Sequence, residues 1–171
     1  YNAGLRFHQW EVSAADEIGK SQLVLSPRAQ ISIQPDWDKD MLFRFSGGIY
    51  YQPPFYRELR YASGMVQPNV KAQQSVHLVV ANDYNFKMWN RPFKLVSELY
   101  YKSMKNQIEY RAGYTPNTLK DPELDYVFGK GEAYGAEFFI NKTKGKFTGW
   151  IGYTLAWTYR TFPDLNNGEK Y

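Results

Sequence analysis

The 171-residue sequence contains no cysteine and only two histidines. Without thiols the chain can form neither a disulfide framework nor a thiolate metal site. His8 and His77 are far apart in the sequence, so we expect no metal site and no cofactor. Asp36, Asp38 and Asp40 alternate in a polar stretch, but the glycine and the distal glutamate of a calcium loop are missing at their required spacings. We therefore read that stretch as a solvated turn.

Long hydrophobic runs are also missing. No apolar stretch approaches the roughly 20 residues that a membrane helix needs, and the mean hydropathy is -0.59. The net charge of +4 is small and dispersed along the chain, which argues against a nucleic-acid partner. The carboxylate pairs Asp16 with Glu17 and Glu98 with Glu137 have no accompanying nucleophile, so we do not expect an enzyme.

The sequence has aromatic residues and a regular alternation of apolar and polar residues. Aromatic side chains make up 18% of the chain, with 15 Tyr, 11 Phe and 5 Trp, a composition that suits strands and membrane-interface girdles. The alternation is clearest at 41–51, where every second residue is apolar or small and most of the others are polar. A period of two indicates a strand with one apolar face and one wet face.

The same alternation predicts strands over most of the chain. They cover residues 4–13, 22–34, 41–51, 75–86, 93–104, 131–142 and 147–160, and the alternation can continue over 106–114. Short connections at 35–40, 87–92 and 143–146 alternate with longer ones at 14–21, 52–74 and 105–130. This pattern predicts an all-β antiparallel up-and-down meander of about 7–8 long strands, with short turns at one end and long loops at the other. Pro27 indicates a strand margin or a bulge within the second strand.

Periodicity alone does not show which face is buried. Three features favour a membrane barrel: predicted strands of about 11 to 14 residues against a usual 5 to 6, aromatic residues near strand ends on the apolar side, and the asymmetry of the connections. The sequence shows seven clear strands, whereas single-chain bacterial barrels close with an even number of strands. We therefore expect this chain to be part of a larger transmembrane β-barrel.

Two alternatives remain open. One is a small stand-alone outer-membrane barrel with a structural or adhesion role, in which the first and last strands pair. The other is a soluble lipocalin-like ligand-binding barrel, which would turn its apolar face inward. That second alternative buries Leu23, Ile31, Phe43, Phe45 and Leu95.

Several stretches resemble one family. They are residues 48–60, 92–94, 98–102, 129–137 and 145–155. These stretches are similar to the barrel of TonB-dependent outer-membrane receptors of the Bacteroidetes type, and the likeness covers nearly the whole chain. They are structural barrel motifs, so they are specific for the family and weak for the substrate.

The resemblance implies a barrel of about 22 strands with a plugged lumen, in the outer membrane of a Gram-negative bacterium. Residues 1–171 would be a barrel segment that lacks the plug domain. The parent protein would mediate energised uptake of a nutrient, which could be a siderophore, a metal chelate, cobalamin or a glycan. The implied partners are outer-membrane lipid, the plug domain of the parent protein, the TonB energy complex and an unknown small-molecule substrate.

The long connection at 52–74 is the first candidate for ligand contact. It offers stacking surfaces and cations that suit sugars, catecholates or carboxylates, at Phe55, Tyr56, Arg57, Arg60 and Tyr61. The alternative is a loop that packs on its neighbours and stiffens the rim.

The wet face of the wall is the second candidate. Arg44, His77, Glu98 and Tyr100 lie on the predicted polar side of their strands, where they could touch substrate. The alternative is a polar network with the plug domain.

Overall fold

The computed structural model describes the backbone of residues 1–14, 17–59, 70–110 and 126–171, and their side chains except at 12–14, 17–20, 56, 57 and 110. The described ranges contain seven strands and two short 3-10 helices. These elements are β1 (Asn2–Ala14), β2 (Glu17–Ile33), β3 (Asp40–Gln52), η1 (Tyr56–Leu59), β4 (Gln73–Met88), β5 (Arg91–Tyr110), β6 (Tyr126–Lys142), β7 (Gly149–Thr161) and η3 (Asn166–Gly168). No described helix is long and apolar enough to cross a membrane.

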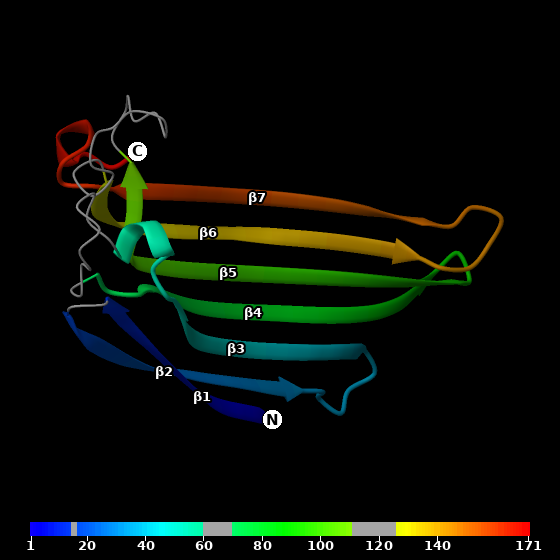
Figure 1. Ribbon diagram of the computed structural model, residues 1–171. Coiled ribbons are helices and arrows are strands. Elements are labelled where there is room, and N and C mark those ends of the chain that lie inside the picture. Colours follow the sequence, from blue (N-terminus) through cyan, green and yellow to red (C-terminus); the bar gives the residue numbers. More distant parts are fainter. Residues whose placement is uncertain (15–16, 60–69, 111–125) are drawn as a thin grey trace.

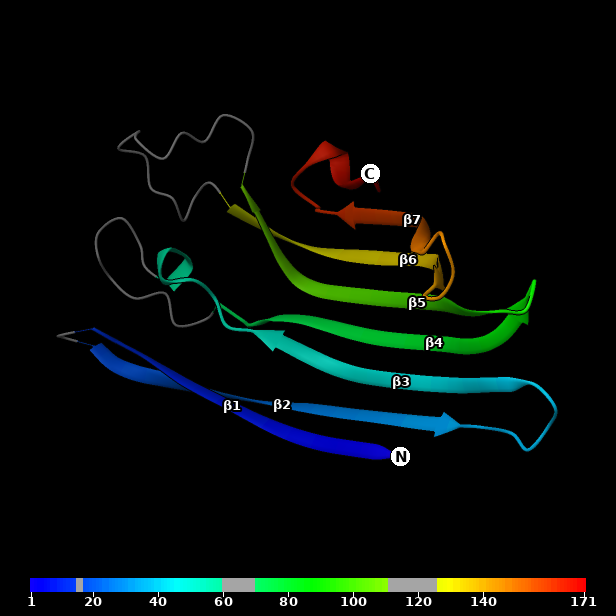
Figure 2. The same ribbon diagram turned by 90° about the vertical axis from the view of Figure 1, so that its right-hand side faces the viewer.

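All seven strands form one sheet in the order of the sequence, and each is antiparallel to the next (Figure 1). This confirms the predicted all-β meander. The connections after β2, β4 and β6 lie at one end of the sheet, which we call the turn end. β1, β3 and β5 end at the opposite end of the sheet, the loop end, where η1 and the C-terminal tail also lie (Figure 2).

The strand register keeps the apolar sets together. Ile31 lies opposite Phe45, Phe45 opposite Val80, and Val80 opposite Leu99 across three successive ladders. A slip of one residue in any ladder would move a strand's apolar set to the other face. The alternation therefore restricts each ladder to the registers that keep the apolar side chains on one face.

Several strands extend beyond their predicted ends. β5 continues to Tyr110 through a bulge between Lys105 and Gln107, where Asn106 has a φ of 55°. The expected polar loop at 14–21 was wrong, since β1 reaches residue 14 and β2 begins at residue 17. Strand pairing overrides polar composition there, because strand propensity depends strongly on context.

Pro27 lies where one of the two ladders of β2 ends, as was expected for a proline within a strand. Pro27 lies opposite Leu5 in an unshifted part of the β1–β2 ladder, and pairing with β3 begins only at Arg28. Proline therefore marks the margin of the β2–β3 ladder, because it cannot donate a ladder hydrogen bond.

The β4–β5 turn consists of Trp89 and Asn90, with φ values of 49° and 55°. This left-handed pair is typical of a two-residue hairpin, so the turn is tighter than the predicted 87–92.

The fully buried core is small and lies mostly at the loop end. It includes Val70, Tyr126, Val127 and Phe162, of which Phe162 is 0% exposed. The chain exposes 12317 Å² in all, whereas a compact monomer of this mass exposes about 8,700 Å². The open apolar side of the described sheet contributes to this excess, as the exposed side chains of Leu23, Ile31 and Leu99 show.

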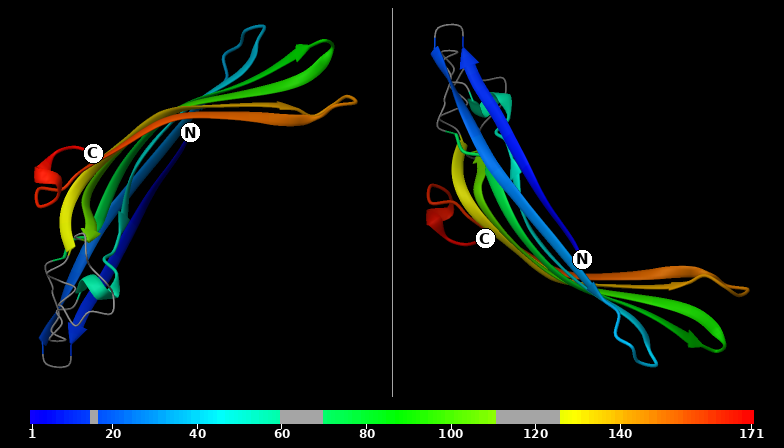
Figure 3. Two further views of the ribbon diagram at one scale, coloured as in Figure 1. Left: turned by 90° about the horizontal axis from the view of Figure 1, so that it is seen from above. Right: turned by 90° about the horizontal axis from the view of Figure 1, so that it is seen from below.

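The sheet is curved and open (Figure 3). Among the described strands, β1 pairs only with β2, and β7 pairs with β6 along its length. Beyond that pairing, Arg160 and Tyr171 exchange two backbone hydrogen bonds of 2.8 and 3.0 Å at the outer edge of β7. The first and last strands do not pair with each other, contrary to what the stand-alone barrel would require.

Candidate functional site

One face of the sheet, the apolar face, carries the apolar alternating set of every strand. Its side chains are open to the surroundings: Leu23 is 65% exposed, Ile31 52% and Phe45 44%. A lipocalin-like barrel would bury these three residues, so that arrangement is not the one observed. Other exposed members are Leu5, Phe7, Leu25, Leu78, Leu99, Phe138, Ile151 and Leu155.

Aromatic rings gather toward both ends of the apolar face. At the turn end Tyr84 stacks on Phe86 at a centroid distance of 5.1 Å, and Phe86 stacks on Phe93 at 5.6 Å. At the loop end Tyr134 stacks on Trp157 at 5.5 Å. Between these groups the face carries both aliphatic side chains, such as Val80 and Leu99, and the rings of Phe45 and Phe138.

The length over which the apolar face carries no charge can be counted along β5. From Phe93 to Ser103 its apolar-face residues carry no charge, and Lys105 is the first ion. Ten residue steps of about 3.3 Å span roughly 33 Å along the strand. With a strand tilt of about 40°, that length becomes a band roughly 25 Å tall, the height of the apolar band of outer-membrane barrels.

The opposite face, the polar face, carries ion pairs that join neighbouring strands. Asp83 accepts hydrogen bonds at 2.6 Å from Arg44 and 2.9 Å from Lys94. The three residues come from β3, β4 and β5, so they bridge three neighbouring strands. Glu98 and Glu137 lie directly opposite each other in the β5–β6 ladder. Two like charges in this position destabilise the pairing of the two strands.

A second polar-face cluster joins cations to an aromatic ring. The Arg28 guanidinium lies over the Tyr50 ring at 4.3 Å, and the Tyr50 and His77 ring centroids are 4.5 Å apart. His77 is within 2.8 Å of the Ser75 hydroxyl and directly opposite Lys102 in the β4–β5 ladder. The cluster thus crosses four strands, from β2 to β5.

Hydrogen bonds connect η1 to the sheet at the loop end. The Phe55 backbone N–H donates to the Glu58 carboxylate at 2.8 Å, and the Glu58 N–H donates to the Phe55 carbonyl at 3.0 Å. The first bond is the half of a capping box in which a glutamate reaches back to the backbone N–H three residues earlier, and the second is the backbone bond of the 3-10 turn. The Tyr126 hydroxyl donates to the Glu58 carbonyl at 3.3 Å. Burial raises the pKa of the Glu58 carboxyl, and the Phe55 N–H lowers it by a smaller amount.

The C-terminal tail folds back on β6 and β7. Phe162 is buried beside Gly129, where an added Cβ would lie 2.6 Å from Phe162 Cε1 and 2.5 Å from the Thr161 carbonyl oxygen. Lys170 pairs with Glu132 and lies over the Tyr159 ring at 4.1 Å. Glycine at position 129 is therefore what lets the tail close over this corner.

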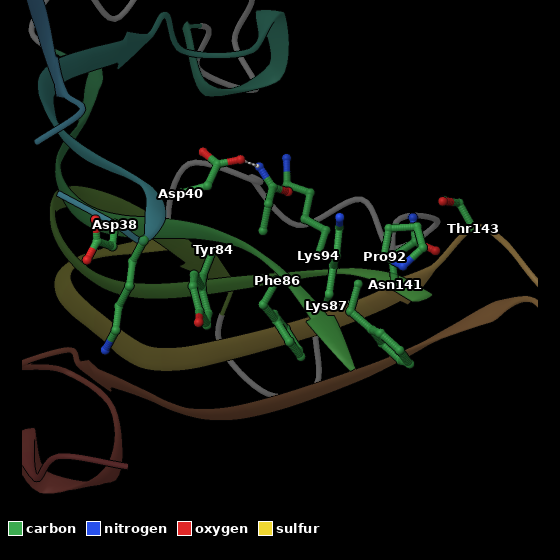
Figure 4. Close-up of a pocket in the computed structure, with 12 residues that line it drawn as sticks. Asp38, Asp40, Tyr84, Phe86, Lys87, Pro92, Lys94, Asn141 and Thr143 are labelled. Carbon is green, nitrogen blue, oxygen red and sulfur yellow. Dashed lines mark hydrogen bonds between the residues drawn. The ribbon is translucent and has the colours of Figure 1, made fainter. Parts of the chain in front are cut away.

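A hollow with a volume of about 720 Å³ lies at the turn end (Figure 4). Its polar-face lining includes Asp40, Lys94 and Asn141, and its apolar-face lining includes Tyr84 and Phe86. In Figure 4 the two rings project away from the side on which Asp40 lies. The hollow therefore combines the ends of both faces rather than gathering groups toward one point.

A smaller hollow of about 280 Å³ lies at the loop end, and Tyr50, Gln52, Ser75, Met104 and Gln107 contribute to its lining. These side chains are neutral. Tyr50 and Ser75 also belong to the cation and aromatic cluster, so the hollow adjoins that cluster.

The predicted loop residues are only partly described. Phe55 is exposed at the start of η1, and Tyr56 and Arg57 form the first part of that helix, with only their backbones described. Arg60 and Tyr61 lie outside the described residues. The structure therefore does not bring these five side chains together as a described site.

The four candidate residues that were predicted on the polar side of their strands do lie on the polar face, but they do not form one cluster. Arg44 belongs to the Asp83 ion pairs, whereas His77 belongs to the cation and aromatic cluster. Glu98 lies opposite Ala81, between those two clusters, whereas the Tyr100 ring lies 5.1 Å from Lys102 Nζ in the second cluster.

Sequence reasoning missed the partners of these residues. Arg28, Tyr50, Asp83 and Lys102 occupy the same alternating positions as the predicted wall residues. That alternation was the available signal, but the ladder register was needed to pair them. Across the described part of the chain, His, Asp and Glu form no group of three or more that could hold a metal ion.

Comparison with protein-family models found no match. Comparisons with curated proteins and with solved structures also found none.

Proposed function

We propose that this chain is a wall segment of a TonB-dependent outer-membrane receptor, whose parent protein takes up a nutrient across the outer membrane of a Gram-negative bacterium. The apolar face would meet lipid, and the polar face would meet the water-filled or plugged lumen. The parent's plug domain and the TonB energy complex would supply gating and energy.

One observation carries the proposal. The middle of the apolar face is exposed and carries no charge, for example at Ile31, Leu99 and Leu155, whereas the face behind it carries ion pairs. Soluble proteins rarely leave an apolar patch of such extent open. A bilayer on one side and water on the other suit both faces.

The edges of the sheet add support. β1 and β7 offer unpaired backbone groups to neighbouring strands, and an exposed edge in lipid is costly because nothing there satisfies its hydrogen bonds. Additional strands would satisfy those groups. Neither the stand-alone barrel nor the lipocalin-like barrel has an observation in its favour here.

The proposal is tested by spin labelling, which the absence of native cysteine makes simple. Leu99→Cys and Leu155→Cys place nitroxides on the apolar face. Glu98→Cys and Thr154→Cys place them on the polar face, one residue away in each case. In reconstituted vesicles we expect molecular oxygen to relax the first pair more strongly and a water-soluble nickel chelate to relax the second pair more strongly. Equal relaxation by the nickel chelate at all four sites would overturn the proposal.

A further inference from the structure

We propose that Arg28 and His77, which both contact the Tyr50 ring, together with Lys102, which lies opposite His77, form a binding site on the polar face for a small organic polyanion whose charges are carboxylates. The inference rests on the proposed function only in taking this face to be wet, and it adds the chemistry of the ligand that the face would meet.

The first step concerns charge. Arg28 and Lys102 take part in none of the four ion pairs found among the described residues. Their ladder row runs from Arg28 through Gly48 and His77 to Lys102 and contains no acidic residue. Cationic side chains on one face with no described counter-charge are complementary to an anion.

The second step concerns the surroundings of His77. From β3 it meets Tyr50, with Gly48 directly opposite, and from β5 it faces Lys102. The nearest polar-face carboxylate along β5 is Glu98, four residues from Lys102, or about 13 Å along the strand. The field at this row is therefore set by cations.

The third step concerns preorganisation. Tyr50 contacts Arg28 at 4.3 Å and His77 at 4.5 Å, so one ring fixes both side chains. Gly48 leaves the room for this arrangement, because an added Cβ would lie 3.0 Å from Arg28 Cγ and 3.1 Å from Tyr50 Cε2. Donors that are held in place before binding lose less entropy when the ligand arrives.

The fourth step concerns the ligand. The guanidinium of Arg28 presents a planar pair of donors that matches a carboxylate. His77 and Lys102 lie on adjacent strands, about 5 Å apart, and Arg28 lies two strands from His77, about 10 Å away. Carboxylates on a small flexible molecule can span this range, and the adjoining 280 Å³ hollow offers neutral amides and Met104 to its body.

The test uses citrate as probe and the full chain in lipid nanodiscs. Citrate binding is measured by calorimetry, and the imidazole signals of the two histidines are followed by NMR. We expect saturable binding that shifts the His77 signals, while His8, on β1, serves as an internal reference. Arg28→Gln and Lys102→Gln should each weaken binding by about tenfold or more, the usual size of one charge-assisted contact.

Controls separate binding from folding. Lys144→Gln removes an exposed cation from the β6–β7 turn and should leave citrate affinity within about twofold, and circular dichroism checks the fold of each variant. Tyr50→Phe keeps the ring and should bind like the unchanged chain, whereas Tyr50→Leu should bind several-fold more weakly. Absence of saturable citrate binding, binding of inorganic phosphate without citrate, or unchanged affinity in both charge variants would each overturn the proposal. Because binding does not depend on which side meets lipid, this test and the spin-label test can fail separately.

Discussion

A lysine placed in the middle of the apolar face distinguishes a lipid-facing wall from a water-facing one. Leu99 is the position to change, because it lies six residues from Phe93 and six from Lys105 along β5. Six steps of about 3.3 Å make roughly 20 Å along the strand, or about 15 Å across a membrane at a tilt of about 40°. That distance is half of a hydrocarbon core, so Leu99 lies at the proposed midplane.

The two environments predict different costs for Leu99→Lys. At the midplane of a bilayer, lysine on the lipid face of a barrel lowers the free energy of unfolding by about 2–4 kcal/mol. Leu99 is 59% exposed, and changing such a residue in water alters the free energy of unfolding by about 0.5 kcal/mol or less. The difference far exceeds the error of an unfolding titration.

The measurement is urea-induced unfolding from lipid vesicles, followed by the fluorescence of the five tryptophans. Two control variants have defined expectations. Phe147→Lys changes a turn-end residue and should cost about 0–1 kcal/mol, as near an interface. Thr154→Lys changes the polar face opposite Glu137 and should cost less than about 1 kcal/mol. If Leu99→Lys costs no more than Thr154→Lys, the lipid-facing assignment is wrong.

Three further predictions concern stability. Gly129→Ala should cost about 1–3 kcal/mol in unfolding titrations because its methyl group would overlap the buried Phe162 ring, whereas Gly4→Ala, which has open space around its Cβ, should cost under about 1 kcal/mol. Asp83→Asn should cost about 1–2 kcal/mol and lose sensitivity to added salt, because it replaces a carboxylate that pairs with two cations. The raised pKa of Glu58 means that the folded state binds its proton more tightly than the unfolded state does, so stability should fall as pH rises through that raised value. Glu58→Gln should flatten this pH dependence in thermal unfolding between about pH 4 and 8, and a variant that retains the full slope would contradict the assignment.

The strands and their faces could be predicted because each face has one chemical character along its whole length. Ile31, Phe45 and Leu155 belong to alternating sets that extend over ten residues or more, and chance rarely sustains a period of two that long. The extra length of β5 was harder to predict, since Asn106 interrupts the alternation and its bulge resets the period. Local composition also favoured a loop at 14–21, where cross-strand pairing decides the structure.

The clusters on the polar face depend on register between strands, which local sequence does not encode. Arg28 and Tyr50 are 22 positions apart and Tyr50 and His77 are 27 apart, yet the ladders bring them into one stack. Predicting that stack would require the offset between β2 and β3 and the offset between β3 and β4, and a period of two leaves each offset open by any even number of residues. Residue type identified His77 as a candidate, but pairing identified its partners.

The two faces of this sheet make opposite demands on their surroundings. Water around both faces would leave Leu23, Ile31 and Phe45 hydrated, at about 25 cal/mol for each Å² of apolar surface. An apolar medium around both faces would remove water from ions such as Arg44 and Asp83, at a cost of several kcal/mol for each charge that loses its partner. Folding a second layer onto the apolar face would satisfy one demand, but the described chain offers no element that covers it. A boundary between lipid and water meets both demands at once, which is why the distribution of charge between the faces, more than the number of strands, carries the proposal for a membrane wall.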